Sequence, residues 1–512
     1  MVAYRVNEAK STSLTFGEVK TLVDRCAYGL LRLGVKPGEI VSIQLPNWWH
    51  FTVLSLACSR ISAVPNGMSP ILREREVGYM VDTVKSRFCF VPETWRGHDY
   101  ARMLGSLVSE LPNLEKFFVI GDSGGSGGEE FAPYFLDHHW EEECAIEELD
   151  VRRPGPNDVA QVQFTSGTSG QPKGVVHTYN TLYASYRGIV TELGLTSNDV
   201  IHAPSTLAHQ TGFLNGCVMP MAEGMKVVYQ DLWNPSTMLD LVDAEGVTYT
   251  SGAPTYIVDV CEVVEQSKRK TSTLRYFRSG SAAIPPGVIR RVEQSLGAQV
   301  VVSWGMTENG ICTMSRKDAS AQDVAASDGY ALPWVELKIS EVEGLTTDDG
   351  QGLLWVKSAS QCVDYLSDHE AFAAAFDDDG WFNTGDLARM RDDGSLRITG
   401  RVKDMVIRGG ENVPVIEVEN ALIEIPCVAE VAIVGIPDDR LGERACAVIV
   451  PTEAKTRIDL ALLQSHLASI NMAKQFWPEF VVVRNGLPRT ASGKVRKAEL
   501  RASVTAELIK AV

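Results

Sequence analysis

The sequence predicts an α/β protein with a large layered N-terminal α/β domain and a small α+β C-terminal domain. Its 512 residues exceed what one hydrophobic core usually supports, so we expect at least two domains. Helix-like segments alternate with short apolar strands over roughly the first 120 residues, a pattern typical of layered α/β cores. Near residue 400 the pattern changes, and we place the domain boundary there, with residues 1–400 in the first domain.

Apolar spacing predicts the first elements. Residues 16–33 carry apolar side chains at helical spacing and are predicted to form a helix. Residues 40–45 and 88–91 are short and mostly apolar, which predicts buried strands. Residues 40–59 carry no formal charge and are long enough to cross a membrane. Because this stretch contains Gln, Pro, Asn and His early on, we expect a strand, a break at Pro46 and a buried helix instead.

Residues 121–128, GDSGGSGG, predict a flexible surface loop. The first five also match the G-x-S-x-G pattern of serine hydrolases, which would make Ser123 a nucleophile. That pattern requires the serine turn to run straight into an apolar helix. Here the loop continues with Ser, Gly and Glu, so we favour the loop and keep a hydrolase as the remote alternative.

The C-terminal part predicts a small α+β domain. After ITGRVKD closes a strand–turn pattern, the chain continues with VIRGGENV, a helix over residues 415–422 and the strand VAEVAIVGI. The strand AVIVP, a helix around residues 459–470 and an apolar VVV near residue 481 follow. No internal repeat is visible. Strands and helices in this order favour a separate layered unit.

Composition and charge narrow the class of protein. The formal net charge of -17 argues against a nucleic-acid or anionic-membrane partner, because phosphate binding needs a basic surface. The ten cysteines are scattered, with no C-x-x-C pair and no Cys/His cluster at zinc spacing, so we expect reduced thiols. The first twenty residues are mixed and charged, unlike a signal peptide. We therefore expect a cytoplasmic protein without a membrane span.

Residues 164–174, FTSGTSGQPKG, form the most informative loop of the sequence. Backbone N–H groups, hydroxyls and the ammonium of Lys173 together suit a polyphosphate. The loop is not a Walker A motif, since Gly174 rather than Ser or Thr follows the lysine. Taken alone, it is compatible with phosphate binding and with an ordinary surface hairpin.

Four further motifs follow this loop in order: WGMTE at 304–308, TGD at 384–386, GRVKDMVIRGGENV at 400–413 and PRTASGK at 488–494. Together the five motifs resemble those of the adenylate-forming (AMP-binding) superfamily, which includes acyl-CoA synthetases, luciferases and peptide-synthetase adenylation domains. The resemblance covers essentially the whole chain. It implies a mobile C-terminal domain and a reaction in which a carboxylate attacks the α-phosphate of ATP, giving an acyl-adenylate and pyrophosphate.

The resemblance also implies where ATP and Mg²⁺ bind. The loop from Thr165 to Lys173 would hold the β- and γ-phosphates, and Glu308 would bind Mg²⁺, which prefers a carboxylate plus phosphate oxygens and water. Asp386 would accept the ribose hydroxyls, and Trp304, where Tyr is commoner, would stack on adenine. The implied ATP-binding residues are Thr165, Ser166, Gly167, Thr168, Ser169, Gly170, Lys173, Gly280, Ser281, Ala282, Trp304, Gly305, Met306, Thr307, Asp386 and Arg401.

Lys494, in PRTASGK, is the residue expected to carry the chemistry. By resemblance it bridges the carboxylate and the α-phosphate, where a cation lowers the repulsion between two anions. Residues 401–404 would form the hinge around Lys403, with 405–512 as the C-terminal domain. Rotation after adenylation would withdraw Lys494 and bring in the CoA-facing residues Arg408, Gly409, Gly410 and Glu411. The spacing Pro-x-x-x-x-Gly-Lys also resembles the recognition pattern of bacterial protein acetyltransferases, which suggests acetylation of Lys494.

Residues 203–221, APSTLAHQTGFLNGCVMPM, are expected to select the acid. They contain no Asp or Glu to pair with a substrate amine, so a non-amino acid with an apolar body is favoured. The sequence of this segment resembles that of the subgroup that contains short- and medium-chain fatty acyl-CoA synthetases and cyclohexanecarboxylate-CoA ligase. We expect one of those acids, with an aryl acid as the alternative. His209 would gate the carboxylate, and the acyl pocket would be lined by His209, Gln210, Thr211, Phe213 and Leu214.

Free CoA is the expected acceptor, because no carrier domain follows Lys494 in this sequence. An enzyme that loads a carrier protein in trans is the main alternative, and competition between CoA and a carrier would separate the two. A non-catalytic binding homologue should lack Lys494, Glu308 or Asp386, and all three are present. Nothing marks the heterocycle chemistry of a luciferase. The resemblance also allows a homodimer.

Overall fold

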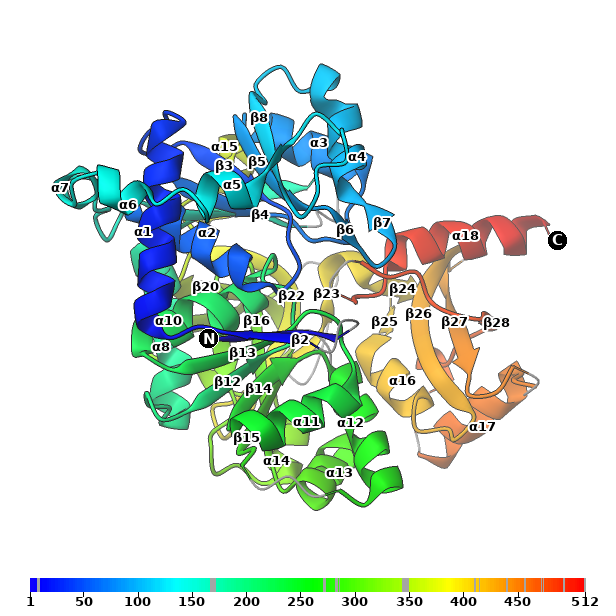
Figure 1. The fold of residues 1–512 in the computed structure, drawn as a ribbon. Coiled ribbons are helices and arrows are strands. Elements are labelled where there is room, and N and C mark those ends of the chain that lie inside the picture. The colour runs from blue at the N-terminus through cyan, green and yellow to red at the C-terminus, as the bar shows by residue number, and fades with distance from the viewer. Residues whose placement is uncertain are drawn as a thin grey trace.

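The computed structural model describes residues 1–6, 10–165, 172–269, 273–280, 284, 286–342, 350–408, 411–413, 415–438, 441–454, 457–470, 472, 474–490 and 493–510. Figure 1 shows a large body, coloured blue to yellow, with a smaller orange and red body beside it. The smaller body begins shortly after residue 400. The expected fold class, a large layered α/β domain with a small α+β C-terminal domain, is confirmed.

A nine-stranded sheet forms one layer of the large body, and parallel strands make up its centre. Its order is β18 (Tyr330–Ala331), β17 (Gly310–Met314), β16 (Gln299–Met306), β15 (Tyr276–Gly280), β14 (Tyr249–Gly252), β12 (Val200–Ala203), β13 (Lys226–Gln230), β1 (Val2–Arg5), β2 (Lys10–Ser13). The helices along this part of the chain are α8 (Tyr179–Leu193), α9 (Gln210–Gly212), α10 (Met219–Glu223), α11 (Pro235–Glu245), α12 (Pro254–Ser267), α13 (Pro286–Leu296) and α14 (Ala321–Ala326).

An eight-stranded sheet forms the second layer (Figure 1). Its order is β21 (Asp364–Leu366), β11 (Lys173–Thr178), β10 (Val159–Thr165), β4 (Val64–Gly67), β3 (Ile40–Ile43), β5 (Phe88–Pro92), β8 (Lys116–Ile120), β9 (Glu129–Glu130). The accompanying helices are α1 (Phe16–Arg32), α2 (Trp49–Arg60), α3 (Glu74–Thr83), α4 (Tyr100–Leu107), α5 (Phe131–Phe135), α6 (Trp140–Glu143), α7 (Glu147–Asp150) and α15 (His369–Ala373). A small hairpin pairs β6 (Thr94–Trp95) with β7 (His98–Asp99).

The expectations for residues 16–33, 40–59 and 88–91 are confirmed by α1, by β3 followed by α2, and by β5. Helix α1 begins where the side chain of Thr15 accepts from the backbone N–H of Glu18 and the Glu18 carboxylate accepts from that of Thr15, a capping box. No helix in the described part of the chain is long and apolar enough to cross a membrane. Ser123 lies in the loop between β8 and β9, without the helix that a hydrolase elbow needs.

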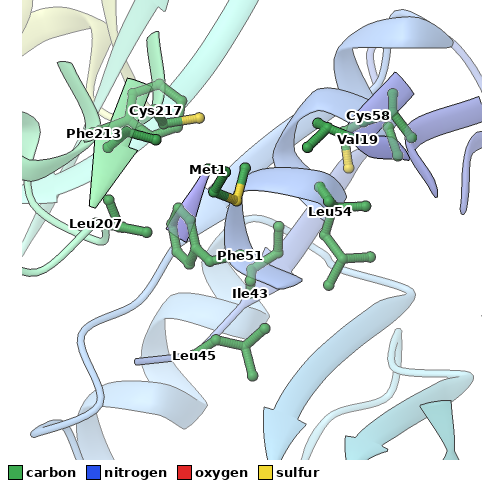
Figure 2. Packing of buried hydrophobic residues seen from close by; sticks show 14 of the residues in the cluster. Met1, Val19, Ile43, Leu45, Phe51, Leu54, Cys58, Leu207, Phe213 and Cys217 are labelled. Atoms are coloured by element: carbon green, nitrogen blue, oxygen red, sulfur yellow. The ribbon is translucent and has the colours of Figure 1, made fainter. Parts of the chain in front are cut away.

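The main hydrophobic cluster joins the two large sheets. Figure 2 shows Phe51 of α2 near Met1, with Phe213, Cys217 and Leu207 gathered together on another side. Side chains from α1, α2 and α8 belong to the same cluster, so these helices connect the layers. Because this core is continuous, the two sheets hold a fixed geometry at their edges, which positions the loops that follow the strands.

Two smaller sheets complete the fold. One, of four antiparallel strands, has the order β19 (Val335–Ser340), β20 (Gly352–Ser358), β22 (Phe382–Met390), β23 (Leu396–Arg401). The C-terminal sheet has the order β25 (Glu411–Val413), β24 (Val406–Arg408), β27 (Gly442–Pro451), β26 (Val428–Asp438), with β28 (Phe480–Val483) also paired to β27. Its helices are α16 (Val415–Leu422), α17 (Leu460–Ser469) and α18 (Lys497–Lys510), and two hydrophobic clusters of its own lie within it.

Candidate active site

The end of β16 and the turn that leads to β17 carry WGMTE, and this segment is tightly packed. A Cβ on Gly305 would lie 2.1 Å from the carbonyl oxygen of Gly310, so only glycine fits there. The carbonyl of Thr307 accepts a hydrogen bond from Nε2 of His177 at 2.7 Å, and Nδ1 of His177 lies 3.0 Å from the Thr181 hydroxyl. Burial lowers the pKa of His177 to about 4, so the ring is neutral near pH 7. His177 therefore anchors the turn that presents Glu308.

Glu308 lies in a partly desolvated position among cations. Its Oε1 accepts from the Tyr365 hydroxyl at 3.2 Å, and its backbone carbonyl accepts from the N–H of Cys362 at 2.6 Å. Burial raises the pKa of the Glu308 carboxyl, while the charges of Lys494 and Arg401 act in the opposite direction. A carboxylate in this setting fits a divalent cation shared with an anionic ligand.

Lys173, at the end of the predicted phosphate loop, lies near the same tyrosine. Its Nζ is 4.7 Å from the centre of the Tyr365 ring and 3.7 Å from Oδ2 of Asp368. No group of three or more His, Cys, Asp or Glu side chains in the described ranges could hold a metal ion. A magnesium ion on Glu308 would therefore take its other ligands from phosphate oxygens and water, which is how magnesium commonly binds beside nucleotides.

Asp386 is buried and held from two sides. It lies in β22 opposite Arg401 of β23, whose Nε is 2.7 Å from Oδ1. Trp304 donates from Nε1 to Oδ2 at 2.9 Å. Gly385 before it has a φ of 68°, in the left-handed region, which turns the chain so that the carboxylate points at the indole and the guanidinium. The residue predicted to bind ribose is thus fixed in orientation, and each oxygen keeps a lone pair for a further donor.

Replacing Trp304 by phenylalanine is expected to raise the KM for ATP about tenfold, with a smaller change in kcat. The variant keeps an aromatic face but removes the donor that orients Asp386, and hydrogen bonds to charged groups are typically worth about 1.5–3 kcal/mol. Initial rates at varied ATP would measure the effect. Trp355→Phe is the matched control, because the Trp355 indole donates to Ser340 instead. An unchanged KM in Trp304→Phe would show that the indole does not position the carboxylate.

Lys494 reaches this region from the C-terminal body. A small turn presents it: the N–H of Thr490 donates to the Lys494 carbonyl at 2.7 Å, and the Thr490 hydroxyl accepts from the Lys494 N–H at 3.1 Å. Its positive charge adds to the burial that lowers the pKa of His209 and partly offsets the burial that raises the pKa of Glu308. The charge of Lys494, in the C-terminal body, therefore acts on two residues of the large body that are far from it in the sequence.

His209 begins α9 and is a neutral imidazole. Its Nδ1 accepts from the N–H of Thr211 at 3.3 Å, so the ring proton lies on Nε2. Burial, assisted by Lys494, lowers the pKa of His209 to about 4. Phe213 and Leu214 continue into a π-helical segment, Phe213–Val218, and are buried in the main cluster, where Figure 2 shows Phe213 beside Cys217. π-Helical turns are frequent at functional sites.

Several predicted residues lie outside the described ranges. They are Ser166, Gly167, Thr168, Ser169, Gly170, Ser281, Ala282, Gly409 and Gly410, and the side chains of Lys403 and Glu411 are also undescribed. Strand β10 ends at Thr165 and strand β15 ends at Gly280. The predicted phosphate loop and the predicted adenine segment therefore each follow the carboxyl end of a strand. Arg408, predicted to face CoA, makes a two-pronged ion pair with Glu479, with both contacts at 3.0 Å.

Sequence reasoning missed three residues that shape this region. His177 follows the phosphate loop in VVHT and could have been noticed as a polar residue in an apolar strand. Tyr365 stands in VDYLSD, where nothing in the sequence marks it, because its role depends on β21 pairing with β11. Arg278 stands in YFRSG, a charged residue inside an otherwise apolar strand.

Comparisons with known proteins identify the family. A family model described as AMP-binding enzyme matches residues 2–366, and one described as AMP-binding enzyme C-terminal domain matches residues 417–494. The chain is 31% identical over 497 residues to the medium-chain fatty-acid–CoA ligase of Escherichia coli (strain K12), covering 97% of this chain and 87% of that protein. It is 30% identical over 494 residues to a salicylyl-CoA synthase / salicylate adenylyltransferase of a Streptomyces species, covering 96% of this chain and 89% of that protein.

Solved structures share the fold. An anthranilate CoA ligase, AuaEII, in complex with anthranoyl-AMP superposes with a TM-score of 0.86 at 24% identity, covering 99% of this chain and 94% of that one. ATP-bound MatB from Rhodopseudomonas palustris gives a TM-score of 0.82 at 24% identity, covering 98% and 95%. At this level of identity the likeness establishes the fold. The acid substrate has to be inferred from the residues of the site.

Proposed function

This chain belongs to the AMP-binding enzyme family, and on that premise we propose that it is an ATP-dependent, AMP-forming acid–CoA ligase. In the first step an oxygen of the acid attacks the α-phosphorus of ATP, and the bond to pyrophosphate breaks. In the second step the CoA thiolate attacks the acyl carbon, the acyl carbon–oxygen bond breaks, and AMP leaves with that oxygen. The first step thus transfers the adenylyl group of ATP to the acid, and the second transfers the acyl group to CoA.

The observation that carries the proposal is the family match over residues 2–366 and 417–494, whose second part ends at Lys494. The charge of Lys494 acts on both His209 and Glu308 of the large body, which fits the same reaction. A carboxylate beside His209 and a triphosphate beside Glu308 would meet at this lysine. Its ammonium would offset the repulsion between the two anions and the charge that develops as they react. A neutral His209 with its proton on Nε2 can donate to the incoming carboxylate without itself titrating.

The described nucleotide residues support the same proposal. Asp386, fixed by Trp304 and Arg401, is suited to accept the two ribose hydroxyls. Lys173 and the hydroxyl of Thr165 lie at the two ends of the predicted phosphate loop, paired with each other across β10 and β11. Mg²⁺ on Glu308 would neutralise phosphate charge and orient the pyrophosphate leaving group.

For the acid, we propose a carboxylic acid with an apolar body and no amine. Residues 203–221 supply no carboxylate for an ammonium. The relatives include ligases named for medium-chain fatty acids and for aryl acids, so cyclohexanecarboxylate, fatty and aryl acids are all to be tested. One methylene changes pocket binding by only about 1–3 kcal/mol, so a measured series must decide the length.

A substrate panel tests the proposed function. Pyrophosphate release from Mg-ATP would be measured with acids from acetate to decanoate, cyclohexanecarboxylate, benzoate and several amino acids, each with and without CoA. We expect release that depends on one class of non-amino acid and a matching acyl-CoA product. Equal acylation of CoA and of a carrier protein would favour the carrier-loading alternative. The absence of pyrophosphate release with every one of these acids, and with dicarboxylic acids of the same lengths, would contradict the proposal.

A further inference from the structure

A buried arginine in the middle of the nine-stranded sheet has only neutral partners. Arg278 lies in β15 and is 3% exposed. Its Nε donates to the Tyr249 hydroxyl at 2.9 Å, Nη1 to the Ser303 hydroxyl at 2.6 Å and Nη2 to the Ser251 hydroxyl at 2.9 Å. These bonds use three of its five N–H groups. The guanidinium is thus rigidly held, and two of its donors remain for another acceptor.

No carboxylate within the described ranges lies at ion-pair distance from Arg278. By contrast Arg275, three residues earlier, is half exposed and pairs with Asp199 at 2.9 Å. A buried cation without an anion is costly, because neutral hydroxyls solvate it less well than water and do not balance its charge. A sheet interior that retains such a residue is expected to gain an anion from elsewhere.

Arg278 lies under the end of the sheet where ligands bind. Strands β14, β15 and β16 are parallel, and ligands of open α/β sheets bind outside the carboxyl ends of such strands. Arg278 is two residues before Gly280, the carboxyl end of β15 and the start of the predicted adenine and acyl segment. A Cβ on Gly280 would lie 2.4 Å from the carbonyl oxygen of Ser303, so the backbones here pack too closely for a side chain.

A chain of hydrogen bonds connects Arg278 to the predicted acyl segment. The Tyr249 hydroxyl that accepts from Arg278 donates to Oδ1 of Asn215 at 2.7 Å. Asn215 in turn donates from Nδ2 to the carbonyl of Thr211 at 2.7 Å. Arg278 is therefore linked through two side chains to the turn that begins at His209.

Unmet hydrogen-bonding capacity lies at the far end of this chain of contacts, in the turn that begins at His209. Gln210 is 4% exposed, and in the described part of the chain neither its Nε2 nor its Oε1 has a partner. Buried polar groups are rarely left without partners unless a ligand or water completes them. The orphan amide of Gln210 is an independent sign of a polar ligand group at the end of the network that holds the guanidinium.

We propose that the acid substrate carries a second carboxylate, which pairs with Arg278 while the first reacts near His209 and Lys494. This inference rests on the proposed acid–CoA ligase activity and narrows its substrate class to dicarboxylic acids with an apolar spacer. The second carboxylate would supply the missing negative charge and accept the two remaining N–H groups. The amide of Gln210 can donate a further hydrogen bond to it. Such a site rejects an acid that ends in a methyl group, since the cation is then left unpaired.

The test compares acids matched in length and shape. Pyrophosphate release would be measured with the dicarboxylates from succinate to sebacate, with their monomethyl esters, and with the monocarboxylates of equal chain length. The ester keeps the size and removes the charge. We expect kcat/KM for the best dicarboxylate to exceed that of its monomethyl ester and of the matched monocarboxylate by about ten- to a hundredfold.

Two variants assign the preference to Arg278. Arg278→Met is expected to abolish the preference for the dicarboxylate and to improve the matched monocarboxylate, while Arg278→Lys keeps part of it through its charge. Arg290→Met, at an exposed position of α13, removes the same charge and is the control. If Arg278→Met does not fold, the wild-type comparison of dicarboxylate with ester still decides.

Two outcomes would overturn the inference. A wild-type enzyme that prefers monocarboxylates or half-esters has no second carboxylate to bind, although it would still be an acid–CoA ligase. A dicarboxylate preference that Arg278→Met leaves unchanged would assign Arg278 to the fold alone. Absence of pyrophosphate release with every acid would instead contradict the proposed function itself.

Discussion

Replacing Lys494 by alanine is expected to slow acyl-adenylate formation by about a hundred- to a thousandfold, the range found when one preorganised electrostatic group is removed from an active site. The physical reason is that the acid and the α-phosphate are both anionic and must approach to bonding distance. We propose the ammonium of Lys494 as the cation that offsets this repulsion, since its charge acts on both His209 and Glu308. Pyrophosphate release in single-turnover experiments would measure the loss. Acetylation of Lys494 removes the same charge and should have the same effect.

The control for this prediction lies on the same segment. Arg496→Ala removes an exposed cation two residues away, whose ion pair with Glu499 is 3.5 Å long and on the surface, and should leave the rate within about twofold. Lys494→Ala supplied with preformed acyl-adenylate should still make the thioester, because the bridging charge serves the first step. A Lys494→Ala enzyme that releases pyrophosphate at the wild-type rate would place the chemistry elsewhere.

Lowering the pH from about 7 to about 5 is expected to destabilise the fold through its buried neutral histidines. Burial lowers the pKa of His202 to about 4 and that of His50 to about 3, from an ordinary value of 6.5. As the pH falls, the unfolded chain takes up protons near its ordinary pKa while the folded state does not. The unfolded state then binds more protons than the folded state. The free energy of unfolding therefore falls by about 2 kcal/mol for each histidine as the pH is lowered from about 7 to about 5.

Urea unfolding of glutamine variants measures this contribution. His202→Gln and His50→Gln should each reduce the difference in unfolding free energy between the two pH values by about 2 kcal/mol. The double variant should reduce it by the sum, because His202 lies in β12 and His50 in α2, and separate sites are usually additive. A pH dependence that is the same in all four proteins would show that these rings take up a proton over the same pH range in the folded state as in the unfolded chain.

Local patterns predicted much of the fold. Residues 16–33 have helical spacing, residues 40–45 and 88–91 are short apolar runs typical of buried strands, and the C-terminal helices and strands show the same patterns. The pairing of β21 with β11 was not predictable, because almost half of the large domain lies between the two strands in the sequence. Tyr365 came to lie against Glu308 and Lys173 only through that pairing.

The site was predictable to the extent that motifs carry it. Glu308, Asp386 and Lys494 stand in short motifs and were named from the sequence. The bond from Trp304 to Asp386 was not, since an aromatic residue was expected to offer its face and instead also offers its N–H. Arg278 was overlooked because its neutral partners come from the neighbouring strands β14 and β16. The segment YFRSG alone does not show which side chains surround the arginine.

Oxygen transfer from the acid to AMP tests the central claim most directly. The enzyme would be given an acid labelled with ¹⁸O in its carboxyl group, together with Mg-ATP and CoA, and the nucleotide product would be analysed by mass spectrometry. Adenylate formation followed by thioester formation predicts AMP that carries one labelled oxygen, because the carboxyl oxygen stays on phosphorus when the acyl carbon is attacked. Unlabelled AMP, or ADP with inorganic phosphate, would contradict an acyl-adenylate intermediate.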